Sequence, residues 1–348
     1  MVNGIVFAVP GDLATPTGGY AYDRRMIGEL TALGWTVELI DLGSGFPQPT
    51  AEIRATAANR LGAMDNRCPI VIDGLAFGVL PELAERMRES HRLVALVHHP
   101  LALETGLSAD EAVFLRASEQ RALTCASHVI ATSAATMSIL AQDFQVPVER
   151  MSVVEPGTDM AAFAPHQPGD AIALLSVGAV VPRKGYDVLV AALDQIRELR
   201  WRLLIAGDCT RSTATTSELQ TQIERLGFGD RIDMRGALSP EQVAVLYSSS
   251  DIFVLASRFE GYGMAFTEAL AHGLPVVGTT VGAAVQNVPQ DAGVLVPVDN
   301  ADALASALRH LMENPQERER LAAGARAVTF PSWREQAERF ARVLQSLA

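Results

Sequence analysis

The chain alternates short apolar runs with longer amphipathic stretches, and it does so in two successive series. The first series of apolar runs is GIVFAV, WTVELI, PIVID, RLVALV, HVIAT and MSVV, and the second is AIALLSVG, WRLLIAG, RIDMRG, DIFVLA, LPVVG and GVLVP. Most of these runs are apolar on consecutive residues, which is typical of strands buried on both faces of a parallel sheet. The sequence therefore predicts the α/β class, with two doubly wound, Rossmann-like parallel-sheet domains.

The stretch between the two series has the composition of a linker. Three prolines and two glycines fall within VVEPGTDMAAFAPHQPGD, residues 153–170, and they interrupt both the strand and the helix periods. A length of 348 residues is sufficient for two domains with separate cores. In the second half, Ser239, Pro240 and Gln242 form a capping-box pattern that predicts the start of a helix. In two facing α/β domains, ligands bind beyond the carboxyl ends of the strands, so the residues there are the candidates for a site.

Net charge and cysteine content exclude several classes of protein. The formal net charge is -12, and residues 1–165 carry 11 basic and 19 acidic side chains, a balance of -8. Neither half is basic, which argues against general binding of nucleic acid or of anionic membranes. The three cysteines include no C-x-x-C pair, which favours a reducing compartment without a zinc site. The amino terminus lacks the pattern of a signal peptide, and we expect a cytoplasmic protein.

Common phosphate and metal motifs are missing from the sequence. It contains no G-x-G-x-x-G, no P-loop and no D-x-D pair, and its His and carboxylate positions show no metal spacing. Protein groups would then have to neutralise a bound diphosphate. Gly18 and Gly19 lie just before an expected amphipathic helix that ends near Gly34. Such glycines let backbone N–H groups approach an anion, but a simple tight turn is an equally good interpretation.

Lys184 is the only lysine among the 28 Lys and Arg residues. It follows Arg183 in a loop between an expected strand and the helix YDVLVAAL. An ammonium group is a compact charge that suits a phosphate oxygen, and two cations near a helix N-terminus suit a diphosphate. Codon bias in an arginine-rich chain is the plainer explanation of a single lysine, and a solvated basic pair is a further possibility. The residues alone leave these interpretations open.

Carboxylates and histidines follow other expected strands. Glu260 lies in the loop after DIFVLA, and Glu268 is expected about two turns into the next helix. A carboxylate can bind two neighbouring sugar hydroxyls, whereas a surface position is the plainer interpretation and is weak only for Glu268, which has apolar neighbours. The doublet His98–His99 follows RLVALV, and Asp73 ends PIVID as a weaker candidate.

Several of these segments together resemble glycosyltransferase family 4, whose members are retaining enzymes of the GT-B architecture. They are TGGY, VH, PGTD, VGAVVPRKGYDVLVAAL, LLIAGD, the segment from Asp251 to Val277 and GVLVPVDN, and they cover nearly the whole chain in order. The resemblance is weaker in residues 35–95, and the segment HHPLALETGL differs from the sequence that is most common in the family at this position. The resemblance implies domains 1–165, on the acceptor side, and 166–330, on the nucleotide-sugar side, with a helix in 331–348 crossing back to the first.

By position, the resemblance implies a role for each candidate residue. Arg183 and Lys184 match the pair that contacts the donor diphosphate, which favours phosphate binding over codon bias for Lys184. Glu268 matches the glutamate that binds the ribose, and Glu260 the one near the transferred sugar. The amides around Gly263 and Met264 match those that help to hold the sugar and the phosphate. Gly18 and Gly19 match the glycine loop over the donor. His98, rather than His99, matches the histidine near the sugar.

The function implied is a metal-independent, retaining transfer of a hexose from a nucleoside-diphosphate sugar, without a further cofactor. We expect a small-molecule acceptor that is soluble, since the basic clusters DRRM and ERMRESHR offer little to an anionic membrane, although the arginines of DRRM are candidates for the cleft. The alternatives are a nucleotide-sugar epimerase of the same architecture and a non-catalytic sugar-nucleotide-binding protein. A nicotinamide oxidoreductase is disfavoured by the missing glycine fingerprint. The donor base, the sugar, the acceptor and the oligomeric state stay open.

Overall fold

A computed structural model describes residues 4–161 and 169–347. The chain forms two compact units, Met1–Gly157 with Pro331–Ala348 (unit 1) and Thr158–Phe330 (unit 2). The domain boundary expected between residues 165 and 166 lies outside the described residues. No helix in the described part of the chain has both the length and the apolar character that crossing a membrane requires.

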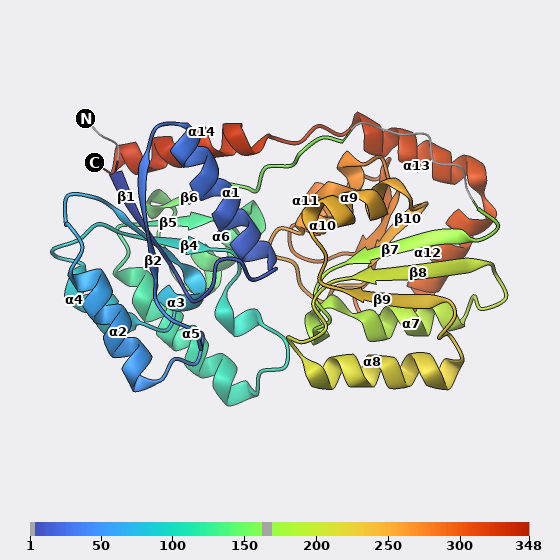
Figure 1. Ribbon diagram of the computed structural model, residues 1–348, viewed down its shortest axis with the longest axis horizontal. Coiled ribbons are helices and arrows are strands. Elements are labelled where there is room, and N and C mark those ends of the chain that lie inside the picture. Colours follow the sequence, from blue (N-terminus) through green and yellow to red (C-terminus); the bar gives the residue numbers. More distant parts are fainter. Residues whose placement is uncertain (1–3, 162–168, 348) are drawn as a thin grey trace. The chain divides into compact units, whose positions relative to one another are not determined.

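Unit 1 is built on a six-stranded parallel sheet in the order β2-β1-β3-β4-β5-β6 (Figure 1). Its strands are β1 Gly4–Val9, β2 Thr36–Asp41, β3 Ile70–Asp73, β4 Leu93–Val97, β5 His128–Ala131 and β6 Met151–Val153. Its helices are α1 Gly18–Ala32, α2 Ala51–Gly62, α3 Gly74–Phe77, α4 Pro81–Met87, α5 Ala109–Thr124, α6 Ala134–Asp143 and the returning α14 Trp333–Ser346.

Helices cover both faces of the unit 1 sheet. On one face, α1 and α14 pack together and bury side chains such as Met26 and Phe340 against the sheet. On the other face, α2 to α6 contribute residues such as Leu61 and Leu140 to a second apolar cluster. The strand β2 forms an edge of the sheet and is mostly exposed, unlike the fully buried β3 to β5. Burial on both faces explains the continuous apolar runs of the central strands.

Unit 2 contains a second six-stranded parallel sheet, in the order β12-β11-β10-β7-β8-β9. Its strands are β7 Ile172–Val177, β8 Trp201–Ala206, β9 Ile232–Gly236, β10 Ile252–Leu255, β11 Val276–Thr279 and β12 Gly293–Val296. Its helices are α7 Tyr186–Asp194, α8 Thr213–Leu226, α9 Pro240–Ser248, α10 Met264–Ala271, α11 Ala284–Asn287, α12 Ala301–Glu313 and α13 Pro315–Ala327.

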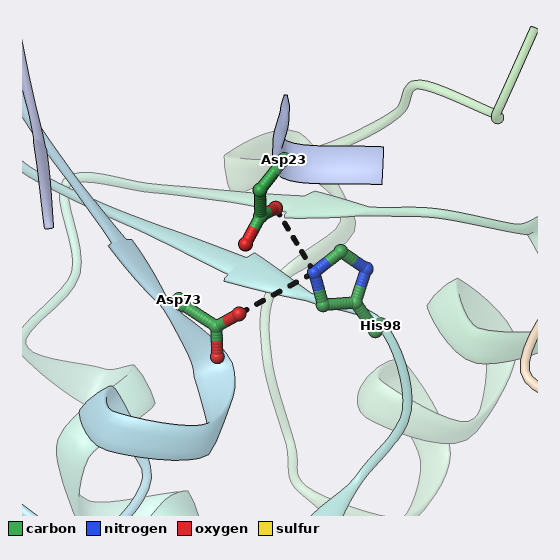
Figure 2. A group of neighbouring side chains, drawn as sticks. All are labelled: Asp23, Asp73 and His98. Carbon is green, nitrogen blue, oxygen red and sulfur yellow. Dashed lines mark hydrogen bonds and ion pairs between the residues drawn. The ribbon is translucent and has the colours of Figure 1, made fainter. Parts of the chain in front are cut away.

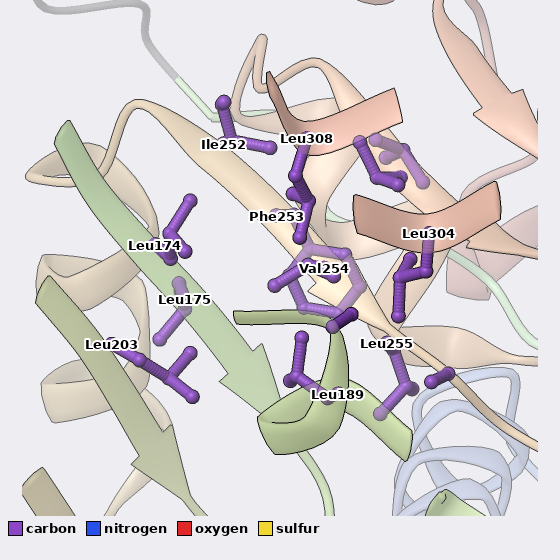
Figure 3. Packing of buried hydrophobic residues seen from close by; sticks show 14 of the residues in the cluster. Leu174, Leu175, Leu189, Leu203, Ile252, Phe253, Val254, Leu255, Leu304 and Leu308 are labelled. Atoms are coloured by element: carbon purple, nitrogen blue, oxygen red, sulfur yellow. The ribbon is translucent and has the colours of Figure 1, made fainter. Parts of the chain in front are cut away.

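The core of unit 2 forms around its central strands. Figure 3 shows side chains of β7, β8 and β10 beside Leu189 of α7 and Leu304 and Leu308 of α12, all of them fully buried. Each such leucine contributes roughly 1.5–3 kcal/mol through its removal from water. The predicted fold class and all twelve expected strands are confirmed, and so is the capping box formed by Ser239 and Gln242.

Candidate active site

The predicted site residues fall into two groups, one in each unit. Unit 2 holds Arg183, Lys184, Glu260, Gly263, Met264 and Glu268, and unit 1 holds Gly18, Gly19 and His98. Apart from Glu268, which lies within α10, these residues follow the carboxyl ends of strands or lie at the starts of the helices beyond them. That edge is where an open parallel sheet binds ligands, because the loops there are free to carry polar groups.

In unit 2, one buried carboxylate lies between two cations. Lys184 Nζ donates to Glu260 Oε1 at 2.7 Å, and Arg183 Nη1 lies 3.7 Å from Glu260 Oε2. Ser257 also donates to Oε1, at 2.6 Å. Glu260 is only 5% exposed, so it is not the surface charge of the plainer interpretation. Burial alone would raise the pKa of Glu260, but the charges of Lys184 and Arg183, together with the hydrogen bonds from Lys184 and Ser257, outweigh burial and hold that pKa below its ordinary value.

The local backbone brings these three residues together. Arg183 and Lys184 lie in a 3₁₀ turn, Pro182–Lys184, which a glycine with φ of 64° joins to α7. That glycine, Gly185, passes so close to the next loop that a Cβ would lie 2.0 Å from the Ala256 carbonyl oxygen. A larger residue would therefore separate the turn from the loop that carries Glu260.

The helix α10 begins beside this group. Its N-cap residue Gly263 has φ of 83°, a left-handed conformation that glycine adopts without strain, and makes no side-chain bond to the first turn. The amides of the first turn, including that of Met264, thus lack a side-chain cap and can bind an anion. Glu268 is the fifth residue of α10, so the expected position two turns into the helix was wrong by about one turn.

Glu268 has a partner that the sequence did not reveal. Tyr247 Oη, from the end of α9, donates to Glu268 Oε2 at 3.0 Å. Burial raises the pKa of Glu268 to about 7, the bond from Tyr247 acts in the opposite direction, and the charge of Asp159 adds to the rise. Close to neutral pH, this carboxyl is therefore poised between its two protonation states.

In unit 1, the charge arrangement is reversed, with two carboxylates that face one imidazole nitrogen (Figure 2). His98 Nε2 lies 3.2 Å from Asp23 Oδ1 and 3.5 Å from Asp73 Oδ2. Both carboxylates are on the same side of the ring, and the second ring nitrogen points away from them (Figure 2). Asp23 and Asp73 are 0% and 2% exposed, and Asp23 Oδ2 has no hydrogen-bond partner among the described residues.

Burial and the neighbouring charges shift the pKa of Asp23 and that of His98. Burial raises the pKa of Asp23 to about 7, with a contribution from Asp73 and against the effect of His98. Burial alone would lower the pKa of His98, but the two carboxylates outweigh it and raise that pKa to about 10. The three ligand atoms lie within 4.8 Å of one another, so one metal ion could contact all of them. The three side chains also pair with one another as ions. The distances therefore fit a bound metal ion and also fit a group of ion pairs without a metal.

Gly19 contributes space for the His98 ring. A Cβ on Gly19 would lie 3.1 Å from the ring atom Cδ2, whereas a Cβ on Gly18 would meet nothing within 4 Å. Both glycines are the first residues of α1, after the N-cap Thr17, so the prediction that they precede the helix was wrong. His99 does not join the cluster and instead lies 3.3 Å from Glu104.

Sequence reasoning missed Asp23, although it singled out the segment DRRM. The segment's arginines bind within unit 1, since Arg24 donates to the carbonyls of Leu13 and Thr15, and Arg25 lies over the Trp333 ring. Its aspartate is the residue that meets His98. The available signal was spacing, because Asp23 lies four residues after Gly19 and so on the same face of α1.

Unit 1 also contains a hollow of about 570 Å³. It is formed by β2 and α2 and is lined by Leu39, Ile40, Asp41, Asn59, Arg60, Ala63 and Met64. None of the predicted site residues lines it. The charge groups, and not this hollow, are therefore the candidates for chemistry.

Comparison with known proteins connects unit 2 to a family. Residues 160–328 match the family model of the glycosyl transferases of group 1. Over 310 residues, the chain is 28% identical to the MMP alpha-(1->4)-mannosyltransferase of Mycolicibacterium hassiacum, an alignment that covers 83% of this chain and 73% of that protein. Two further curated relatives are each 30% identical, and the chain spans 54% of their length.

Solved structures extend the likeness to the whole chain. Sucrose-phosphate synthase from Thermosynechococcus elongatus has a TM-score of 0.83 at 23% identity, with 99% of both chains covered. HepE from Anabaena, solved in complex with UDP-glucose, has a TM-score of 0.76 at 20% identity, with 98% of this chain and 100% of that chain covered. At these identities the structures establish the fold, with its two parallel sheets.

Proposed function

We propose that the chain is a group 1 glycosyltransferase of the GT-B, family 4 type, and that it is a retaining enzyme that transfers a hexose from a nucleoside-diphosphate sugar to a soluble small molecule. The observation that carries the proposal is the group formed by Arg183, Lys184 and Glu260 in unit 2, which lies within the residues that match the family. The complex of HepE with UDP-glucose supports a nucleotide sugar as the donor.

The unit 2 group has the charge that a leaving diphosphate needs. Two cations face one carboxylate, so the group as a whole carries one surplus positive charge. Glu260 holds the ammonium group of Lys184 in place, and the surplus positive charge of the group attracts an anion. As the sugar–phosphate bond breaks, negative charge develops on the diphosphate, and fixed donors of this kind stabilise it. Loss of one such donor typically costs about 10²–10³ in rate.

The proposed chemistry needs no separate carboxylate base. The bond between the anomeric carbon and the diphosphate oxygen breaks, and the acceptor oxygen bonds to the same face of the sugar. The acceptor proton passes to an oxygen of the departing diphosphate. In this scheme, Arg183, Lys184 and the N-terminus of α10 do the work that a metal ion does elsewhere, and Glu268 binds the ribose hydroxyls.

A nucleotide screen tests the donor site. UDP, GDP and ADP are each added to the protein, and thermal unfolding is recorded. A ligand at 100 times its Kd adds about 2.7 kcal/mol of stability, so one base should give a clear shift in Tm. The proposal fails if none of the three nucleotides shifts Tm.

Turnover of the matching nucleotide sugar tests the reaction. Activity should persist in a chelator, and proton NMR should show an α-glycoside product from an α-linked donor. A β-product would exclude retention, and loss of activity in the chelator would exclude metal independence. Release of free nucleotide and free sugar product without any acceptor would indicate the epimerase alternative instead.

A further inference from the structure

Arg258 connects three loops at the carboxyl edge of the unit 2 sheet. It follows β10, and its Nη1 donates to the Pro182 carbonyl oxygen at 2.7 Å, while its backbone N–H donates to the Arg183 carbonyl oxygen at 2.8 Å. Its guanidinium also binds both carboxylate oxygens of Asp187, at 2.7 and 3.0 Å, and Nε donates to Asp299 at 2.7 Å. The loops joined in this way follow β7, β10 and β12.

The segment that Arg258 holds is the turn that carries both phosphate-binding candidates. The turn spans only Pro182–Lys184, and its own backbone bonds are those from Lys184 to Val181 and from Gly185 to Pro182. A single 3₁₀ turn of this kind is weak by itself. Two of its carbonyls are fixed by Arg258, and the flexible stem of Lys184 begins from this fixed backbone.

Asp299 supplies a second sign that this junction is under constraint. It is a non-glycine residue with φ of 54°, in the left-handed region that such residues adopt at a cost. Its carboxylate pairs with Arg258, so the contact is retained in spite of the backbone strain. Residues in strained conformations persist where the surroundings fix them, and they occur often at functional sites.

We propose that Arg258 is a positioning residue for the leaving diphosphate. It fixes the turn Pro182–Lys184, so that Arg183 and Lys184 present their charges in one arrangement before the donor binds. This inference rests on the proposed function of the same group. The fixed turn favours the reaction through preorganisation, because donors that are already in place need not be reordered as charge develops on the diphosphate.

The test separates phosphate binding from nucleoside binding. In Arg258→Met, the affinity for the nucleoside diphosphate should fall by about tenfold or more, and kcat should fall at least as far. Affinity for the matching nucleoside, which lacks phosphates, should be unchanged, since Glu268 lies on another element. Hydrogen exchange at the amides of Lys184 and Gly185 should become faster than in the wild-type protein.

Arg309→Met is the matched control. Arg309 is another arginine of unit 2 that pairs with two carboxylates, Glu198 and Glu313, and with a backbone carbonyl, that of Gln195. Its removal should leave nucleotide affinity, kcat and exchange at the turn unchanged. Arg258→Lys retains the charge without the planar fork and should show an intermediate loss.

The possible outcomes distinguish failure of the positioning role of Arg258 from failure of the proposed function. Equal weakening of nucleoside and nucleoside diphosphate in Arg258→Met would indicate general damage and overturn the positioning role, as would unchanged kcat and unchanged exchange. If Arg258→Met does not fold, Asp187→Asn and Arg258→Lys carry the same comparison. If the wild-type protein binds no nucleoside diphosphate, the proposed function fails, whereas the exchange measurement still decides whether Arg258 fixes the turn.

Discussion

At the carboxyl edge of its sheet, each unit buries a small group of charged side chains, and the two groups have opposite compositions. In unit 1, the carboxylates of Asp23 and Asp73 both face Nε2 of His98. In unit 2, the carboxylate of Glu260 lies between the cations of Arg183 and Lys184. With every group ionised, the first has a surplus negative charge and the second a surplus positive charge.

This difference assigns different chemistry to similar folds. An anion such as a diphosphate is attracted by the unit 2 group and repelled by the unit 1 group. The unit 1 group instead stabilises the protonated form of His98, which makes the ring a hydrogen-bond donor and a poor general base. The sheet edge therefore provides the place for a site, and the side chains decide what binds there.

The largest effect is expected from removing one of the two cations of the unit 2 group. Lys184→Met should lower kcat by about 10²-fold or more, because the leaving diphosphate loses a fixed donor. It should also destabilise the fold by about 3 kcal/mol, because Glu260 is left buried with a weaker partner at 3.7 Å. Steady-state kinetics and urea unfolding measure the two effects separately.

A double variant separates catalysis from stability. Lys184→Met combined with Glu260→Gln removes both charges of the closest pair, so stability should return towards the wild-type value while activity stays low. Arg202→Met removes a charge from an exposed position on β8 and should change neither property. Wild-type kinetics in Lys184→Met would contradict the role of this cation.

The next effect concerns Glu268, whose pKa is raised to about 7. Ribose hydroxyls donate to the carboxylate form of Glu268. The Kd of the nucleotide sugar should therefore decrease by about tenfold for each unit by which the pH rises towards 7, and it should stay constant above pH 7. Glu268→Gln should weaken binding by about 1.5–3 kcal/mol and remove this pH dependence. Calorimetric titrations from pH 5.5 to 8.5 test both statements, and a pH-independent wild-type Kd would count against ribose binding.

The same shift gives a signed prediction for stability. The pKa of Glu268 is higher in the folded protein than its ordinary value of 4.5, so its favourable contribution is complete at low pH and is lost as pH rises through about 7. At pH 8, the permanently neutral Glu268→Gln should therefore have a higher Tm than the wild type, and at pH 4 the difference should vanish. An unchanged or lower Tm at pH 8 would contradict the raised pKa.

The sequence predicted the two sheets well for a physical reason. Strands such as β4 and β10 are buried on both faces, so every residue in them is apolar, and the helices between them carry clear end signals such as Ser239 and Gln242. The strand β2 was also found, although it is exposed at the edge of its sheet. The boundaries of short elements, such as α10, were less accurate because glycine-rich turns allow several starting points.

The site was predicted only in part, because partners distant in sequence are not visible in a strand-end pattern. Arg183, Lys184 and Glu260 were singled out one by one, and their contacts emerge only when β7 and β10 pair in the sheet. Asp23 was missed since it lies inside a helix, and Arg258 because its partners lie in two other loops and in α7.

A smaller effect is expected from changing the charge balance of the unit 1 group. Asp23→Asn removes one of the carboxylates that raise the pKa of His98 to about 10, so that pKa should fall by about one unit or more, equivalent to about 1.4 kcal/mol. Nitrogen NMR of labelled histidine follows the protonation directly, with His98→Gln to assign the signal. A wild-type His98 that titrates near pH 6.5 would show that the two carboxylates do not control the ring.

The smallest effect expected is at membranes, where the acidic character of residues 1–165 should prevent binding. Residues 1–165 carry a net charge of -8 and no lysine, whereas docking helices rely on clusters of Lys and Arg that each contribute about 1 kcal/mol near an anionic surface. Two exposed apolar side chains, Val113 and Phe114 on α5, are the strongest opposing feature, and Asp110 and Glu111 precede them in the same helix. Flotation with anionic liposomes at low salt, where screening is weakest, should leave the protein unbound. Protein that floats with the liposomes and is released by salt would show that a local basic patch outweighs the acidic average, and the soluble acceptor would then be the wrong choice.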